Sequence, residues 1–265
     1  GNLDAESLPS TVTVVARPDN PGFGAGVNAG VAALDTEGLC TFYVALNNDT
    51  VLATGFLDAA ASALVVGVGA AGGPIRDPDR GSLWYAGGRV SFLTGTVRQQ
   101  RSEAAAGRPR DVGFIPATAM AVAPAAWREL GGFDPRYFLY NEDLDLCLRL
   151  RRAGWRLRFE PGMACRHRLG TATGSAERSP LYLENLTRTR LLPFRSPAYR
   201  GYLAVVHTLY NLLRIAALAL RHRGACGPYA AAVARGHAAA VAGSWSSGPR
   251  LEMGISGRSR ATRES

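Results

Sequence analysis

The residues of this chain best suited to acid–base chemistry are three carboxylates within four positions, Glu142, Asp143 and Asp145. An amphipathic run over residues 146–155 follows at helical spacing, and Asn141 stands where a helix N-cap would be. The acids would then occupy the first helical turn, where free N–H groups and the helix dipole favour carboxylate charge. We therefore expect Asp143 to be ionised at pH 7. Ordinary helix capping explains the same acids without chemistry, so the motif alone leaves both interpretations open.

Two further side chains could bind a hard divalent cation. Asp49 follows an apolar run over residues 41–46 that is typical of a buried parallel strand, and ligands of open α/β sheets bind beyond the carboxyl ends of strands. A carboxylate there could hold a cation beside a diphosphate. His167 follows the strand expected over residues 156–159, and a neutral imidazole could complete such a site. Taken singly, a turn explains Asp49 and a surface position explains His167 equally well.

The elements that would position these residues alternate between strand and helix, which predicts an α/β layered sheet. Strands are expected over residues 11–16, 41–46, 66–71, 114–122 and 156–159, and helices over 27–34, 55–65, 125–130 and from 141 onward. Residues 98–110 are polar, Arg-rich and without periodicity, so we expect a mobile surface loop there. At 265 residues the chain suits one large domain, or one domain with an appendage.

The net charge of +9 is concentrated in the last quarter of the chain. Residues 1–194 carry 20 Arg and 19 acidic residues, a balance of +1, whereas residues 195–265 carry 10 Arg and 2 acidic residues, a balance of +8. A nearly neutral core argues against a nucleic-acid-binding protein. All 30 basic residues are Arg, which suits diphosphates or anionic lipid headgroups, although codon bias explains the same preference.

The cysteines and the glycines exclude several other classes of protein. Cys40, Cys147, Cys165 and Cys226 are scattered without a C-x-x-C pair, so we expect reduced thiols and no zinc site. Four glycines over residues 22–30 suggest a nucleotide loop, yet five residues separate them from the expected strand. A dinucleotide fingerprint follows its strand at once, so a nicotinamide oxidoreductase is improbable.

Residues 201–220 are mostly apolar, interrupted by His207, Asn211 and Arg214. This run is borderline for a membrane-spanning helix. Flanking Arg residues fit an interfacial helix on an anionic membrane, while a core-packing helix explains the same pattern equally well.

The order of the motifs resembles the family 2 glycosyltransferases, most closely their bacterial rhamnosyltransferase- and galactofuranosyltransferase-like branch. The blocks that carry the resemblance are residues 20–30 (NPGFGAGVNAG), 46–50 (LNNDT), 131–149 (GGFDPRYFLYNEDLDLCLR), 153–155 (AGW) and 167–173 (HRLGTAT). The resemblance covers about residues 17–195. It implies an α/β, GT-A-like (nucleotide-diphospho-sugar transferase) fold, with a mixed, mostly parallel sheet flanked by helices, and a helical tail.

The resemblance also implies roles for single residues. Asp49 would bind Mg²⁺ or Mn²⁺ on the donor diphosphate, together with His167. Asp143 would be the general base of an inverting hexosyltransferase, with Glu142 beside it contacting the acceptor or the base. Asn47 stands where many members keep an acid. The nucleotide sugar would contact a set comprising Asn20, Gly24, Asn28, Asn47, Asn48 and Asp49.

The resemblance further implies partners, boundaries and a place in the cell. The donor would be a nucleotide-diphosphate sugar and the acceptor a cell-surface polysaccharide or lipid-linked glycan. Residues 1–195 would form the transferase core, and residues 196–265 a basic helical tail contacting the inner face of the cell membrane from the cytoplasm.

The family's first strand and its base-binding segment do not precede residue 17, so the core is expected to be an N-terminally truncated one that binds sugar nucleotide poorly. The alternative is an inactive fragment acting as a membrane- or partner-binding module.

Overall fold

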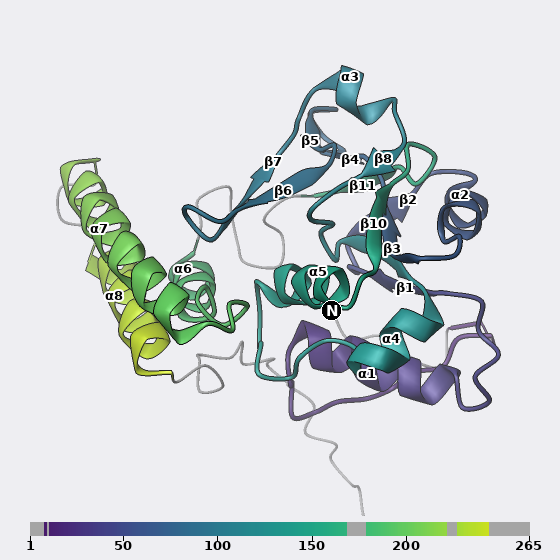
Figure 1. Cartoon of the computed structure of the whole chain (residues 1–265), viewed down its shortest axis with the longest axis horizontal. Helices are drawn as coiled ribbons and strands as arrows, with labels where there is room; N and C mark the ends of the chain where they lie inside the picture. Colours follow the sequence, from purple (N-terminus) through teal and green to yellow (C-terminus); the bar gives the residue numbers. More distant parts are fainter. Residues whose placement is uncertain (1–7, 10, 169–178, 222–226, 244–265) are drawn as a thin grey trace, which may run out of the picture.

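A five-stranded sheet lies at the centre of the molecule (Figure 1). The computed structural model describes residues 8–9, 11–168, 179–221 and 227–243. In the order β1-β9-β3-β10-β8, the strands are Tyr43–Leu46, Ala119–Val122, Val68–Gly72, Arg156–Phe159 and Arg110–Asp111. Strands β3 and β10 run parallel, whereas the other neighbours in this sheet run antiparallel.

The mixed α/β architecture is thus confirmed, but the expectation of a mostly parallel sheet is wrong. The apolar run at residues 41–46 shows why: β1 pairs antiparallel with β9 at the edge of the sheet, where its side chains alternate between buried and more exposed. A continuous apolar run is typical of buried parallel strands, but it does not fix the direction of the neighbouring strand, as the antiparallel β1 shows.

A second sheet of four strands adjoins the first and begins where β1 ends. In the order β2-β11-β4-β5, its strands are Thr50–Leu52, Cys165–His167, Ile75–Arg76 and Leu83–Tyr85. The turn at residues 47–49 carries the chain from β1 into β2. Strand β2 pairs antiparallel with β11, with Thr50 opposite His167. This register places the residue after Asp49 across from the predicted histidine.

Helices cover the central sheet, with α2 and α5 on opposite sides of β3 and β10 in Figure 1. The helices of this part are α1 (Phe23–Leu34), α2 (Phe56–Ala63), α4 (Pro124–Leu130) and α5 (Glu142–Arg152). Strand β3 is fully buried and made of small residues, which lets α5 approach closely. A Cβ at Gly69 would lie 2.8 Å from Leu150 and 2.7 Å from Trp155, so this glycine sets the separation of helix and strand.

Two expectations from the sequence are wrong. Residues 11–16 form no strand, because they are exposed and no described strand pairs with them. Residues 98–110 are not a plain loop, since they contain the short helix α3 (Glu103–Ala106). Ser102 caps this helix by accepting from the Ala105 N–H, and the Arg76 guanidinium contacts the Glu103 carboxylate at 2.5 Å. Polar contacts hold this short helix, and its sequence lacks the hydrophobic periodicity from which a helix is predicted.

A β-hairpin and three helices complete the described chain. The hairpin strands are β6 (Gly88–Ser91) and β7 (Thr96–Gln99), and the helices are α6 (Pro180–Arg188), α7 (Pro197–Arg221) and α8 (Gly227–Ala242). The three helices form a bundle beside the sheets (Figure 1). None of the helices described is long and apolar enough to cross a membrane.

Helix α6 packs against α8 across the boundary predicted at residue 195. A Cβ on Gly236 would lie 2.4 Å from the Glu184 carbonyl oxygen, so the two helices approach closely there. The Glu184 carboxylate is buried and accepts from Arg188 in its own helix and from Arg235 of α8. Residues 244–265 of the predicted tail lie outside the described residues.

Candidate active site

The structure brings together Asp49 and His167, the two predicted cation ligands. The His167 imidazole Nε2 lies 3.0 Å from the Asp49 carboxylate Oδ1, because the β2–β11 pairing holds their backbones side by side. The Asn47 amide Nδ2 lies 3.3 Å from the same imidazole nitrogen. Asp49 remains 24% exposed and His167 12% exposed, so a ligand can reach the carboxylate. Asn48, the remaining residue of the turn, is exposed.

This pair fits a divalent cation that keeps most of its coordination sphere for substrate and water. Two adjacent ligands of an octahedral Mg²⁺, each at about 2.1 Å, are about 3.0 Å apart. The spacing between the Asp49 and His167 donor atoms matches that value, which is also the ordinary length of a hydrogen bond between them. Across the described ranges, no cluster of three or more His, Cys, Asp or Glu side chains is placed to hold a metal. Two protein donors suit Mg²⁺ or Mn²⁺ shared with a diphosphate.

Trp84 is a neighbour of this pair that sequence analysis did not identify. Its indole ring on β5 lies 6.5 Å, centroid to centroid, from the His167 imidazole. His167 Nδ1 is buried without a hydrogen-bond partner in the part of the chain that the structure describes, so the ring is held by packing on that side. In the sequence, the two adjacent aromatic residues Trp84 and Tyr85, just after the turn at residues 77–81, are the feature from which Trp84 could have been identified.

Glu142 and Asp143 begin helix α5, where the sequence predicts them. The Asp143 carboxylate accepts hydrogen bonds from the backbone N–H of Leu144 at 2.8 Å and of Ala117 at 3.4 Å. Asp143 is partly exposed, whereas Glu142 is buried and its Oε2 has no partner among the described atoms. Asp143 can therefore reach a substrate, while Glu142 lies behind it.

Burial raises the pKa of both carboxyl groups above the usual range. For Asp143, loss of hydration outweighs the backbone N–H groups of Leu144 and Ala117, which lower its pKa. For Glu142, burial is the larger cause, and the charge of Asp143 raises its pKa further. The expectation that the helix N-terminus would favour the charged form of Asp143 is thus wrong, because desolvation is the larger effect, although a pKa of about 6 still leaves the carboxyl group mostly ionised at pH 7.

Residues 117–118 connect the two halves of the site, a role that sequence analysis missed. The Asn47 N–H donates to the Thr118 carbonyl oxygen at 3.0 Å, and the adjacent Ala117 N–H donates to Asp143. The backbone just before β9 therefore touches both the turn that carries Asp49 and the start of α5. Nothing in the sequence of residues 117–118 indicates such a role.

A strained turn precedes the two acids. Tyr140 and Asn141 have φ angles of 69° and 65°, a left-handed conformation that is costly for residues other than glycine. Asn141 occupies the N-cap position, but its side chain does not cap the helix as expected. Its amide instead donates to the Thr189 hydroxyl at 2.8 Å and to the Leu186 carbonyl oxygen at 3.2 Å. The left-handed backbone directs the amide away from the helix and toward α6.

Two other parts of the motifs have structural roles. The Asn28 side chain donates to the Phe133 carbonyl oxygen at 2.8 Å and accepts from the Phe133 N–H at 2.9 Å. Arg149 pairs with Asp145 at 2.6 Å and donates to the carbonyl oxygens of Leu130 and Gly132. Both sets of bonds fix the loop that leads into α5.

The predicted nucleotide contacts of the N-terminal residues stay predictions. A Cβ on Gly24 would lie 2.8 Å from the Phe133 Cβ, which shows how closely α1 packs on that loop. Asn20 has a φ of 40° in the turn before α1 and is half-buried. Residues 169–173 of the last motif lie outside the described residues.

Comparison with known protein families assigns the chain to one of them. Residues 4–189 match the family described as "Glycosyltransferase like family 2". The chain belongs to this family. The match includes Asp49, Asp143 and His167, so the residues that the structure brings together are part of the family domain. The resemblance inferred from the sequence motifs is confirmed.

Among the curated relatives of this family 2 glycosyltransferase are two bacterial rhamnosyltransferases. It is 31% identical to N-acetylglucosaminyl-diphospho-decaprenol L-rhamnosyltransferase of Mycobacterium tuberculosis, over 58% of this chain and 58% of that protein. It is 35% identical to rhamnosyltransferase WbbL of Escherichia coli strain K12, over 29% of this chain and 30% of that one. The chain thus spans less than two thirds of the length of these relatives.

Solved structures of two glycosyltransferases show a weak likeness to the chain. GalNAc-T7 with UDP, GalNAc and Mn²⁺ has a TM-score of 0.46 and 16% identity, covering 67% of this chain and 36% of that one. The mannosyltransferase PcManGT from Pyrobaculum calidifontis, in complex with GDP-Man and Mn²⁺, has a TM-score of 0.42 and 14% identity, covering 84% of this chain and 66% of that one.

Proposed function

We propose that the chain transfers a sugar, rhamnose or a similar hexose, from a nucleoside-diphosphate donor to a lipid-linked glycan, with inversion at the anomeric carbon. The observation that carries this proposal is the backbone connection between two groups. The backbone of Asn47, two residues before Asp49, bonds to Thr118, and the adjacent Ala117 N–H donates to the Asp143 carboxylate. Glycosyl transfer needs one group that binds the donor diphosphate and another that accepts the proton of the acceptor, and Asp49 with His167 and Asp143 would fill these two roles.

Asp143 would accept the proton of the acceptor hydroxyl. As the hydroxyl oxygen forms its bond to the anomeric carbon, the bond from that carbon to the diphosphate oxygen breaks, and the diphosphate leaves with the electron pair. The raised pKa of Asp143 makes it a stronger base than an aspartate in water, which helps it to take the proton. Burial and the charge of Asp143 raise the pKa of the neighbouring Glu142 to about 8, so Glu142 would be mostly protonated at pH 7.

Asp49 and His167 would hold a divalent cation against the donor diphosphate, with Asn47 orienting the imidazole. A bound cation would offset the charge that develops on the leaving diphosphate. Asn47 removes one carboxylate from the family's metal motif, so this chain would depend more on the donor's own phosphate oxygens for cation affinity. The nucleotide base and ribose would lie near Asn20, Gly24 and Asn28.

The relatives suggest the identity of the acceptor. The mycobacterial relative is named for transfer to N-acetylglucosaminyl-diphospho-decaprenol, a lipid-linked diphosphate sugar. By analogy, we propose an acceptor with a diphosphate-linked sugar on a long isoprenoid, used at the cytoplasmic face of the cell membrane.

A transfer assay tests this function. The chain is incubated with Mn²⁺, a panel of nucleoside-diphosphate sugars that includes a rhamnose donor, and an N-acetylglucosaminyl diphosphate carrying a short isoprenoid. We expect product with the rhamnose donor or a close relative, and its loss when the cation is chelated. Equal product in the presence of chelator would contradict the role given to Asp49 and His167.

A further inference from the structure

Helix α7 holds the tip of the β6–β7 hairpin, so that the two form one surface. The Tyr199 hydroxyl donates to the Phe92 carbonyl oxygen, and the Tyr202 hydroxyl donates to the Leu93 carbonyl oxygen at 3.0 Å. His207 Nε2 lies 2.7 Å from the Thr94 carbonyl oxygen. The hairpin tip is therefore fixed to the helix by contacts along two turns of α7.

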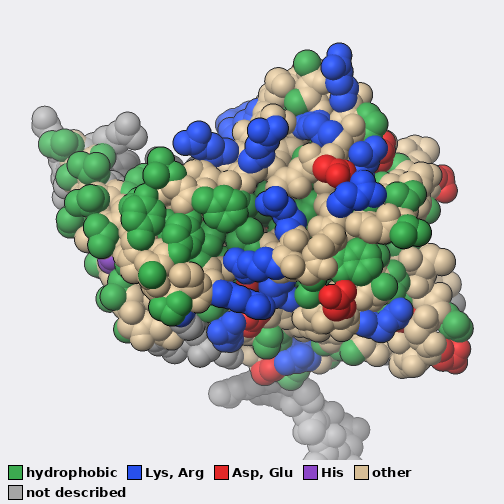
Figure 2. All heavy atoms as spheres, in the orientation of Figure 1, with side chains coloured by type: hydrophobic (Ala, Val, Ile, Leu, Met, Phe, Trp, Pro, Cys, Tyr) green, Lys and Arg blue, Asp and Glu red, His purple; other side chains and the backbone are tan. Residues whose placement is uncertain are grey.

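This surface exposes a long apolar stripe. At the hairpin tip, Phe92 is 55% exposed and Leu93 68% exposed. The exposed large apolar residues of α7 lie mostly three or four positions apart, and are Tyr202, Val205, Leu209, Tyr210, Leu212, Leu213 and Leu220. At 1.5 Å per residue, the stripe from Tyr202 to Leu220 is about 27 Å long. Figure 2 shows hydrophobic side chains gathered over this end of the molecule. Monomeric proteins rarely leave such a surface uncovered.

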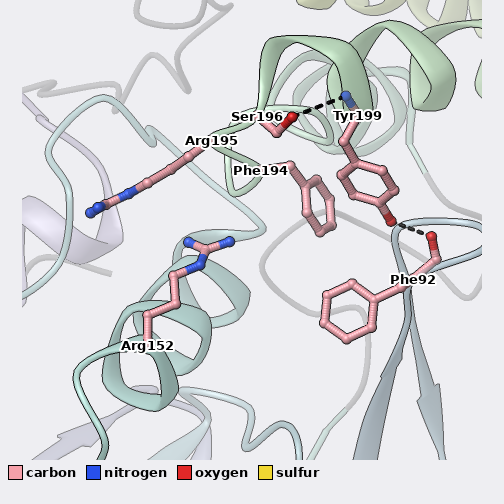
Figure 3. Close-up of a pocket in the computed structure, with 6 residues that line it drawn as sticks. All are labelled: Phe92, Arg152, Phe194, Arg195, Ser196 and Tyr199. Carbon is pink, nitrogen blue, oxygen red and sulfur yellow. Dashed lines mark hydrogen bonds between the residues drawn. The ribbon is translucent and has the colours of Figure 1, made fainter.

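Two pairs of Arg side chains border the stripe at the hairpin tip. Arg89 and Arg98 lie directly opposite each other across the hairpin, where like charges are destabilising. With Leu93 they line a pocket of about 350 Å³. Arg152 and Arg195 line a second pocket, of about 330 Å³, together with Phe92, Phe194 and Tyr199 (Figure 3). Burial and then the charge of Arg195 lower the pKa of Arg152. An anion in either pocket would relieve this repulsion.

Two of the three segments that carry these Arg side chains lack acidic residues, whereas the third, α5, also carries Asp145, whose charge raises the pKa of Arg152. Neither residues 88–99 nor residues 185–251 contain an Asp or a Glu. In Figure 2, Arg side chains lie along the border between the apolar end and the sheets. A twofold dimer through this face would bring the same Arg pairs of both copies to one interface, which like-charge repulsion opposes. An apolar stripe bordered by positive charge instead suits an anionic lipid surface.

We propose that the hairpin tip and the exposed face of α7 bind a bilayer that contains anionic phospholipid. Helix α7 lies in the plane of the interface with its apolar stripe in the acyl region, and Phe92 and Leu93 enter beside it. The two Arg pairs bind lipid phosphates, for which the guanidinium fork is well matched. This surface deepens the proposed function, since it would carry the site to a lipid-linked acceptor, but binding itself needs no catalysis.

Sedimentation with vesicles tests the inference. The chain is mixed with vesicles of phosphatidylcholine alone, or of phosphatidylcholine with about a third phosphatidylglycerol. We expect binding to the anionic vesicles that weakens with salt. The double variant Arg89→Gln/Arg98→Gln should weaken binding roughly 25-fold, at about fivefold per Arg. The triple variant Leu93→Asn/Leu209→Asn/Leu213→Asn should weaken it about tenfold or more.

Matched controls carry the same changes elsewhere on the exposed surface. These are Arg101→Gln/Arg108→Gln on either side of α3, and Leu34→Asn/Leu39→Asn/Leu57→Asn, and both should bind as the unmodified chain does. Thermal melting shows that each variant is folded. Equal binding to neutral and anionic vesicles, or equal effects of the controls, would overturn the inference. So would a dimer that the leucine substitutions dissociate. Retained transfer to the short-chain acceptor by a non-binding variant would leave the proposed function intact.

Discussion

The His167 imidazole Nε2 on β11 lies 3.0 Å from the carboxylate Oδ1 of Asp49, which stands in the turn before β2, far away in the sequence. The β2–β11 ladder makes this contact possible, because Thr50 is directly opposite His167. The pair is held by backbone pairing on one side and by the Trp84 ring on the other. Its geometry is therefore fixed before any ligand arrives, which reduces the cost of ordering a cation site.

The first prediction concerns cation binding by this pair. Replacing Asp49 with Asn removes the charge of one ligand, and replacing His167 with Ala removes the other ligand, so Mn²⁺ affinity in the presence of a nucleoside diphosphate should fall about 10- to 100-fold in each variant. Water-proton relaxation by Mn²⁺ measures this directly. Asp58→Asn is a matched control, since Asp58 is an exposed carboxylate in the first turn of α2. Unchanged relaxation in both site variants would remove Asp49 and His167 from the cation site.

The second prediction concerns stability and pH at Glu142. Burial raises the pKa of Glu142 in the folded chain, so the folded state binds a proton more tightly than the unfolded state. The free energy of unfolding should therefore fall as pH rises from the unfolded pKa through the raised folded pKa. Glu142→Gln removes this loss and should stabilise the chain by about 1–3 kcal/mol on the alkaline side. Thermal melts from pH 5 to 9 measure the effect. A variant that melts lower than the unmodified chain across this range would contradict it.

The third prediction concerns the strained turn before the acids. Thr189 is buried, accepts from Asn141, and lies 3.0 Å from the Tyr140 carbonyl oxygen. Thr189→Val keeps the shape but removes the hydroxyl, and should cost about 1–3 kcal/mol because polar groups lose their partner. Turnover should fall more than donor affinity, because the start of α5 shifts. Thr189→Ser keeps the hydroxyl and should restore turnover. Equal turnover of the Val and Ser variants would show that this contact does not position the acids.

The fourth prediction concerns the crossing of α6 and α8. Gly236→Ala places a Cβ 2.4 Å from the Glu184 carbonyl oxygen, so the helices must separate. We expect a loss of about 1–3 kcal/mol in stability, measured by thermal melting. Gly201→Ala in α7 is the control, because its Cβ meets nothing within 4 Å. That control should gain up to about 1 kcal/mol from helix propensity. Equal melting of the two variants would mean that α6 and α8 are not closely packed.

Local patterns predicted several elements of the central sheet and its helices. The amphipathic run after Asn141 predicted α5, and the small apolar residues at 66–71 predicted β3, because periodicity and burial are properties of neighbouring residues. The order of the motifs then predicted Asp49, Asp143 and His167 as partners. Asp49 and His167 are in direct contact, and residues 117–118 connect Asp143 to the backbone of Asn47 in the turn that carries Asp49.

Long-range pairing could not be predicted in the same way. Nothing near Thr189 indicates that it holds Asn141, and nothing near Ala117 indicates a bond to Asp143, because both contacts depend on tertiary packing. The strand direction in the central sheet was also predicted wrongly, because a buried antiparallel strand such as β1 can have the same apolar sequence as a parallel one. The balance between desolvation and the helix N-terminus at Asp143 depends on burial, which the motif does not give.

The most direct test of the central claim is turnover by Asp143→Asn, with Asp58→Asn as control, in the transfer assay at several pH values. Because an amide cannot accept the acceptor's proton, we expect turnover to fall about 10²- to 10⁴-fold while the domain stays folded. The unmodified chain should lose activity as pH falls through the raised pKa of Asp143, since only the ionised carboxylate is a base. Normal turnover in Asp143→Asn would contradict the account.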